Sequence, residues 1–382
     1  MALSMQNCNL SNSTILLTDL QWSSTEKVSI LAILPTLMSI GDVTNLAFLY
    51  TVVTIPRMHT VANIYLANLA ITDMLFVSQA TISYVIVYLM TPIRNAAIQT
   101  QAGCWLAFLP SVLFYYVSLA MVFLVSMERY YAVCQPLKHR AFTKLGRAKT
   151  HIVISWLIGF IFAVPSTLTW GDITSINICT RKLDVNELPM PYIQTLYICQ
   201  MKHPHQTIIN LIAELIPSTL FCVTLIASCV LYVKVLININ TQTKTTMKSS
   251  KTHIAKVKNQ IARVLIINGI LFFICQIPYR MNSIHEILSD NKVWSLPEDN
   301  RQLLIIFSRL SLYINSTINP FVYGAGSRYY RNAFFEAFGL CASKESNSSH
   351  IDRVKSFTPR QLTDLSESNV GTQQRTISTS IS

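Results

Sequence analysis

Residues 307–323, with the sequence FSRLSLYINSTINPFVY, combine an apolar helical pattern with groups that are costly to bury. They carry a fixed positive charge at Arg309, two amides at Asn315 and Asn319, and a helix breaker at Pro320. A guanidinium can hold carbonyl or carboxylate oxygens with paired hydrogen bonds. Amides can join a buried polar cluster, and a proline can kink a helix. The pattern predicts that Arg309 faces a ligand and that Pro320 lets the end of the helix move.

A second group of polar residues lies in other apolar segments. Asp73 stands in NIYLANLAITD, and it can form one buried cluster with Asn45, Ser118, Asn315 and Asn319. An ionised carboxylate in an apolar region needs a cation or strong hydrogen-bond donors. Two interpretations are open: a site for a small cation such as sodium, or a structural hydrogen-bond network without an ion. No other metal site is predicted.

Two arginines are candidates for ligand recognition. Arg280 follows Pro278, and Arg309 lies about three helical turns from Pro320. In one interpretation, both guanidiniums face a cavity and hold carbonyl or carboxylate oxygens of a ligand. In the other, Glu214 neutralises one arginine in a structural salt bridge.

The segments that must position these residues are long and apolar. Of the 382 residues, 51% are hydrophobic and 13% are charged, whereas a soluble domain has about 25% charged residues. The mean hydropathy is +0.40. A continuous run of roughly 20 apolar residues crosses a bilayer as a helix, because lipid offers the backbone no hydrogen bonds. The predicted fold is an all-α membrane protein with seven transmembrane helices, near 28–55, 61–90, 103–134, 150–170, 207–237, 259–289 and 302–325.

The distribution of charge predicts the orientation. The loops after the first, third and fifth runs are basic, and the opposite loops carry more acidic residues. Basic loops stay in the cytoplasm, so we expect a multi-pass protein of the plasma membrane with an extracellular N-terminus. The net charge of +12 therefore reflects the orientation of the chain in membrane lipid, and no nucleic-acid partner is expected. The absence of an internal repeat disfavours an inverted-repeat transporter.

Both ends of the chain differ from residues 28–340 in composition. Residues 1–27 are predicted to form an extracellular tail, with glycosylation sequons at Asn9 and Asn12. Residues 341–382 are rich in serine and threonine and are predicted to form a disordered cytoplasmic tail. Phosphorylation would make this tail a charged docking segment, for which arrestin is the expected partner.

The cysteines outside the apolar runs have distinct predicted roles. Cys341 follows RYYRNAFFEAFGL, which predicts a short amphipathic cytoplasmic helix at about 327–339 and makes Cys341 a palmitoylation candidate. Cys104 opens the third run and faces an oxidising compartment. A disulfide to Cys199 would fix the loop between the fourth and fifth runs over the bundle. Cys199 is favoured because it lies closer to the fifth run, and Cys179 is the alternative.

Together these features resemble the rhodopsin-like (class A) G-protein-coupled receptors over about residues 28–340. The resemblance rests on a set of motifs: Asn45, NLAITD, Cys104, ERY from Glu128, Trp156, Pro217, FFICQIP and NPFVY. It implies a seven-helix receptor with an extracellular ligand and a heterotrimeric G protein as partners. The G protein is expected to dock against Arg129 and the third cytoplasmic loop, with Glu128 and Tyr323 as further coupling residues.

Within this family the sequence is most similar to peptide receptors. Ser111 stands where amine receptors have an aspartate, and Tyr313 stands where opsins have the lysine that carries retinal. The long loop 171–206, with a hairpin expected around Asn186 to Pro189, is typical of peptide receptors. The segments PYR at 278–280, SRLSLYINSTINP at 308–320 and GRAKTHIV at 146–153 resemble the thyrotropin-releasing hormone receptors.

The narrower resemblance implies a ligand site. Three residues match peptide-binding positions of the thyrotropin-releasing hormone receptors, and three more are expected beside them. The expected ligand-binding residues are Tyr279, Arg280, Arg309, Ser111, Tyr115 and Tyr313. The ligand residues of that group in helix 3 are not matched, because Val112 and Tyr116 stand at their positions.

Three departures from the family pattern bear on activation. Gln276 replaces the usual tryptophan of helix 6, and Leu225 replaces a tyrosine of helix 5 that meets the released arginine. Lys258, at the base of helix 6, would repel Arg129. These residues predict a weakened lock on the inactive state.

The predicted function is that of a receptor for an extracellular neuropeptide, including one like thyrotropin-releasing hormone. The alternatives are a lipid or small carboxylate ligand, or a transporter or channel that uses the buried charges as a path. We see no nucleophile–base pair, metal-ligand spacing or phosphate-binding loop, so neither an enzyme nor a cofactor is predicted.

Overall fold

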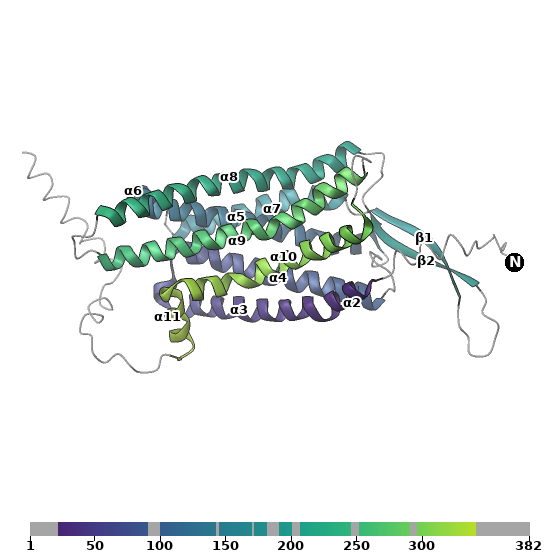
Figure 1. Cartoon of the computed structure of the whole chain (residues 1–382), viewed down its shortest axis with the longest axis horizontal. Coiled ribbons are helices and arrows are strands. Elements are labelled where there is room, and N and C mark those ends of the chain that lie inside the picture. The colour runs from purple at the N-terminus through teal and green to yellow at the C-terminus, as the bar shows by residue number, and fades with distance from the viewer. Residues whose placement is uncertain are drawn as a thin grey trace, which may run out of the picture. The chain divides into compact units, whose positions relative to one another are not determined.

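The computed structural model describes residues 22–90, 100–142, 145–169, 172–181, 191–200, 207–245, 252–290 and 296–340. Long helices lie alongside one another in a bundle (Figure 1). The long helices are α3 (Leu34–Thr54), α4 (Val61–Met90), α5 (Gln101–Cys134), α7 (Leu145–Thr169), α8 (Thr207–Thr245), α9 (Thr252–Asp290) and α10 (Glu298–Gly326). The shorter helices are α2 (Ser24–Val28), the π-helix η1 (Ser29–Ile33), the 3₁₀ helix η2 (Pro56–Met58), α6 (Pro136–Phe142) and α11 (Arg328–Ala337).

The helices match the predicted runs and extend past several of them. Within the described residues, six helices are long and apolar enough to cross a membrane; the first span joins α2, η1 and α3. The run predicted at 207–237 continues as α8 to Thr245, and the run at 259–289 begins as α9 at Thr252. An apolar run ends where the lipid ends, whereas the helix continues through polar residues that water can solvate.

The seventh long helix, α10, has two faces. Its outward face exposes large apolar side chains, and its inward face buries hydroxyl and amide side chains. The exposed set is Leu303, Phe307, Ile314 and Phe321, and the buried set is Ser308, Ser311, Asn315, Ser316, Thr317 and Asn319. In a membrane, polar groups face the bundle interior and apolar groups face lipid. This polarity explains why α10 is less apolar on average than the other long helices.

A two-stranded antiparallel sheet adds to the helical fold. Strand β1 (Asp172–Arg181) pairs with β2 (Pro191–Gln200), and residues 182–190 between them lie outside the described part of the chain. The predicted hairpin is thus present as a paired ladder. It projects from one end of the bundle, and α11 lies at the other end (Figure 1). We call these the hairpin end and the α11 end.

Helix α5 is the central element of the bundle. It packs against α4, α7, α8 and α9, while α10 packs against α3, α4 and α9. A close approach fixes α10 against α3, because a Cβ atom on Gly41 would lie 3.0 Å from Oγ1 of Thr317. This spacing lets polar groups of α3, α4 and α10 meet in the interior.

Candidate functional site

The guanidinium of Arg280 lies among aromatic rings inside the bundle. Arg280 follows Pro278 on α9, and only 7% of its surface is exposed. Its Cζ atom lies 4.5 Å from the centre of the Tyr115 ring on α5 and 5.9 Å from that of Phe221 on α8. The ring of Tyr279 is 5.0 Å away. Aromatic faces attract cations, so these rings stabilise the charge where α5, α8 and α9 meet.

The guanidinium of Arg309 has a single aromatic neighbour among the described residues. Its Cζ atom lies 4.1 Å from the centre of the Tyr84 ring on α4. About one turn further along α10, Tyr313 is almost fully buried, and its hydroxyl oxygen accepts a hydrogen bond from Thr81 at 2.9 Å. Helix α4 therefore holds this part of α10 through two neighbouring contacts.

Among the residues that the structure describes, no group satisfies every donor of either arginine. Nε of Arg280 and Nη1 of Arg309 are buried and have no hydrogen-bond partner in the described part of the chain. Among the side chains that the structure describes, neither arginine forms a salt bridge with a carboxylate. A buried donor without an acceptor costs about 1–3 kcal/mol, and a charged one costs more. Carbonyl or carboxylate oxygens would satisfy these donors.

A polar centre lies deeper in the bundle. Nδ2 of Asn319 donates to the Asp73 carboxylate at 2.6 Å. Asn45 donates to the backbone carbonyl of Ser316 at 2.9 Å. Ser118 donates to Thr72, the residue before Asp73, at 3.1 Å. Helices α3, α4, α5 and α10 thus meet through one network of hydrogen bonds.

At the α11 end, Arg129 is held on its own helix. Its guanidinium forms an ion pair with the adjacent Glu128, which is 3% exposed. His139, on α6, lies 3.2 Å from the second oxygen of Glu128. The carboxylate therefore joins α5 to α6 and holds the arginine on its own helix.

Tyr323 joins α10 to α9 and α11. Nδ2 of Asn268 donates to its hydroxyl oxygen at 3.3 Å, and its ring lies 5.5 Å from that of Tyr330. Tyr330 donates to Asn63 on α4 at 2.9 Å. Burial raises the pKa of the Tyr330 phenol, so it stays a neutral donor at physiological pH. The tyrosine of the NPFVY motif thus lies where three helices and α11 meet.

Residues 44–323 match the family described as the 7 transmembrane receptor (rhodopsin family). This match covers most of the chain and includes the Asp73 network, the ion pair of Arg129 and both candidate ligand arginines. The chain belongs to the rhodopsin family of receptors. Family membership makes it a multi-pass receptor and not an enzyme, and it favours the receptor over the transporter or channel alternative.

Several relatives of this receptor are peptide receptors by name. It is 25% identical to the neuromedin U receptor homolog nmur-2 of Caenorhabditis elegans over 72% of this chain and 71% of that protein. It is 24% identical to galanin receptor 2a of Danio rerio over 90% of this chain and 85% of that protein. It is also 24% identical to the thyrotropin-releasing hormone receptor of Ovis aries, over 83% and 79% respectively.

The structure brings some of the predicted ligand residues of the receptor together. Arg280, Tyr279 and Tyr115 meet around one guanidinium. Tyr313 instead lies in a packed cluster, with its hydroxyl bound to Thr81. Ser111 donates to Gln79 of α4 at 2.6 Å, so its hydroxyl already joins two helices. A ligand role for each of these residues stays a prediction.

Only some members of the predicted polar cluster are in direct contact with one another. Asp73 touches Asn319, whereas Asn45 and Ser118 reach neighbouring residues and Asn315 is buried on the same helix. No group of three or more His, Cys, Asp or Glu side chains that could hold a metal occurs in the described residues. The site therefore has one carboxylate with hydroxyl and amide neighbours.

Sequence reasoning missed several of these neighbours. Tyr84, Phe221 and Gln79 lie within apolar runs, where the hydropathy pattern predicts only a spanning helix. The polarity of Gln79 inside its run is a signal that could have found it. Gln276, which departs from the family pattern, is 4% exposed, and its Oε1 has no partner within the described residues, about one turn from Arg280. His139 was counted only as part of a basic loop.

Some predicted sites fall outside the description. Asn9, Asn12, Cys341 and the tail 341–382 lie outside the described residues, as do the side chains of Glu214, Cys179 and Cys199. Cys104 is disulfide-bonded. In the β-ladder, Cys199 lies opposite Ile173 near the start of β1, and β1 packs against α5. Which cysteine pairs with Cys104 stays a prediction.

Proposed function

We propose that this receptor binds a short extracellular peptide with Arg280 and Arg309 and activates a heterotrimeric G protein. The observation that carries the proposal is the pair of guanidiniums that lie inside the bundle near the hairpin end, against aromatic rings and with unpaired buried donors. Peptides are rich in backbone carbonyls and can supply several acceptors at once. The relatives named for neuromedin U, galanin and thyrotropin-releasing hormone support a peptide ligand.

The orientation belongs to the same proposal. The hairpin end faces the outside of the plasma membrane, the N-terminus is extracellular, and Asn9 and Asn12 are glycosylated. A Cys104–Cys199 disulfide holds the hairpin beside the ligand site. At the cytoplasmic end, α11 lies on the membrane surface, Cys341 is palmitoylated, and the phosphorylated tail binds arrestin.

Ligand binding is coupled to the G protein through α10. This helix carries Arg309 near the hairpin end, Asn319 in the polar centre and Tyr323 at the α11 end, with Pro320 between the last two. A ligand that binds the active arrangement more tightly shifts a two-state bundle toward it. Release of Arg129 from Glu128 then opens a surface for the G protein. Asp73 and Asn319 would hold a sodium ion, whose charge would balance the carboxylate in the inactive arrangement.

The proposal is tested by expressing the receptor in cells and measuring calcium release against a library of short neuropeptides, each as the amide and as the free acid. Replacement of Arg280 or Arg309 by glutamine should reduce the potency of an active peptide by at least about tenfold, because a charged hydrogen bond is lost. A lipid or small carboxylate that activates the receptor while every peptide fails would instead support the alternative ligand class.

A further inference from the structure

Tyr232 of α8 lies unusually close to Gly269 of α9. Only 4% of Tyr232 is exposed. A Cβ atom on Gly269 would lie 1.9 Å from the hydroxyl oxygen of Tyr232 and 2.8 Å from its Cζ atom. No side chain can occupy that space unless α9 or the tyrosine moves. The absence of a side chain at Gly269 is therefore what lets the hydroxyl end of the tyrosine approach the backbone of α9.

The same hydroxyl is anchored to the central helix. Ser126 of α5 donates to the hydroxyl oxygen of Tyr232 at 2.7 Å, and both residues are buried. Around Tyr232, a buried cluster joins α8 to α9 through Val235, Ala262 and Ile266. The phenol thus contacts α5 through a hydrogen bond and α9 through packing.

No ion pair performs this task in the described residues. Arg129 is paired with Glu128 of its own helix, and no salt bridge among the described side chains joins α5 to α9. Lys258, at the start of α9, is exposed and carries the same charge as Arg129. Lys258 therefore supplies no attraction between α9 and Arg129, and the contacts that hold α9 near α5 are of another kind.

We propose that Ser126, Tyr232 and Gly269 form a latch that holds α9 against α8 and α5 in the state seen here. The phenol fills the space at Gly269 while its hydroxyl stays on Ser126. Outward movement of the α11 end of α9 breaks this contact. The strength of the latch therefore determines the fraction of ligand-free receptor in which α9 has moved outward. The latch concerns the resting equilibrium and does not depend on which ligand the receptor binds.

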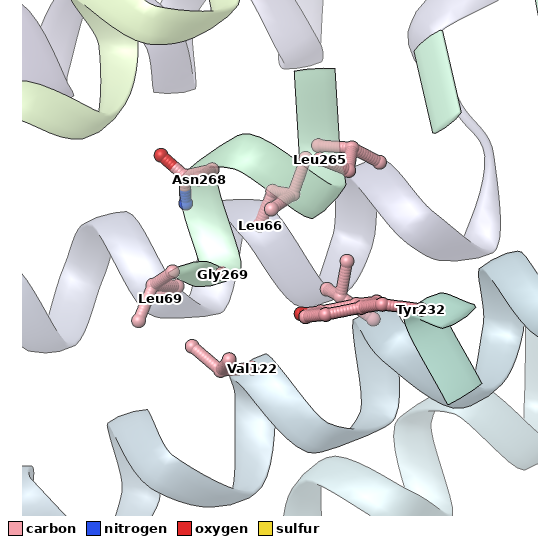
Figure 2. A pocket seen from close by; sticks show the side chains of 8 residues that line it. Leu66, Leu69, Val122, Tyr232, Leu265, Asn268 and Gly269 are labelled. Atoms are coloured by element: carbon pink, nitrogen blue, oxygen red, sulfur yellow. The ribbon is translucent and has the colours of Figure 1, made fainter. Parts of the chain in front are cut away.

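The cavity beside the latch is too small to accommodate a displaced Tyr232 ring. A cavity of about 10 Å³ lies between Tyr232, Gly269 and Asn268, with leucine and valine side chains as its other walls. Figure 2 shows the Tyr232 ring entering this space with its hydroxyl end among Leu69, Val122 and Gly269. This volume is on the order of what one water needs. A methyl group added at Gly269 must therefore act on the position of α9.

Basal signalling, measured in cells without ligand and normalised to receptor at the surface, tests the latch. Gly269→Ala should raise it about fivefold or more, because overpacking disfavours the closed arrangement. Tyr232→Phe should raise it about two- to fivefold, because the bond to Ser126 is lost. Gly146→Ala is the matched control and should have no effect, since nothing lies within 4 Å of its added methyl.

The double variant with Tyr232→Phe and Gly269→Ala distinguishes a latch from two independent defects. With Tyr232→Phe present, the added methyl no longer meets the hydroxyl, so the two effects should combine to less than their product. Effects that multiply, or single variants with wild-type basal signalling at equal surface levels, would overturn the proposal.

A direct measurement covers the case in which Gly269→Ala fails to reach the surface. Fluorine NMR of purified, ligand-free Tyr232→Phe receptor, with a fluorinated amino acid encoded at the exposed position Lys256, reports on α9 alone. Encoding the label avoids the exposed cysteines Cys222 and Cys229. A larger population of a second α9 environment than in wild type is expected, and identical spectra would contradict the latch.

Discussion

The guanidinium carbon of Arg309 lies 4.1 Å from the centre of the Tyr84 ring, across the interface between α10 and α4. One buried nitrogen of the same group has no hydrogen-bond partner among the described residues. The ring stabilises the charge without satisfying its donors, since a π-face offers attraction but no lone pair in the plane of the N–H bond. The protein therefore positions the Arg309 guanidinium, and one of its donors stays available for a hydrogen bond to another acceptor.

Replacing Tyr84 by leucine should weaken the response to an activating peptide. A desolvated cation–π contact is worth about 2 kcal/mol, so potency should fall on the order of tenfold to thirtyfold in a concentration–response measurement. Tyr84→Phe keeps the ring and should stay within about threefold of wild type. Equal losses in the two variants would show that the ring does not position Arg309.

Asp73→Asn should remove the effect of sodium on the ligand-free receptor. Wild-type receptor should melt a few degrees higher in sodium chloride than in choline chloride, because an ion that binds only the folded state stabilises it. Asp42→Asn is a matched control: Asp42 is the other carboxylate in the described interior of α3 and α4, and it accepts from Ser78 at 2.9 Å. If sodium raises the melting temperature of Asp73→Asn as much as that of wild type, Asp73 belongs to a hydrogen-bond network without an ion.

Gly41→Ala should destabilise the packing of α3 on α10. The new methyl would lie 3.0 Å from Oγ1 of Thr317, which cannot rotate freely because it donates to the carbonyl of Tyr313 at 2.8 Å. Overpacking typically costs about 1–3 kcal/mol, so the melting temperature should fall by several degrees. Gly146→Ala, with open space around its Cβ, should melt at or above the wild-type temperature.

Tyr330→Phe should loosen α11. The change leaves Oδ1 of the buried Asn63 without its donor, at a cost of about 1–3 kcal/mol. Amide hydrogen exchange should therefore become faster in α11 and at the start of α4. Tyr329→Phe removes a bond to the exposed carbonyl of Arg57 and should have a smaller effect. The reverse order would argue against a buried anchor at Tyr330.

The fold could be predicted from the sequence because the local sequence pattern determines each helix. A run of apolar residues specifies a membrane helix without reference to its neighbours, and RYYRNAFFEAFGL specifies a short amphipathic one, which appears as α11. The polar residues of α10 were recognisable for the same reason, since each is costly wherever it is placed in lipid.

The partners of these residues could not be predicted with the same success. Arg309 meets Tyr84, and Ser118 meets Thr72 rather than Asp73, because helix rotation and tilt decide which side chains touch. The contact between Tyr232 and Gly269 depends on the distance between α8 and α9 at that point, which neither helix determines alone. A glycine inside a run signals a close approach but does not name the residue that approaches.

The most direct test of the account is a competition-binding measurement on purified receptor with the peptide that is most potent in the calcium screen. Wild type, Arg280→Gln and Arg309→Gln should be compared at equal amounts of folded protein. The account predicts that each substitution weakens binding by at least about tenfold, as expected for a lost charged hydrogen bond. Wild-type affinity in both variants would contradict the assignment of the buried guanidiniums to the ligand.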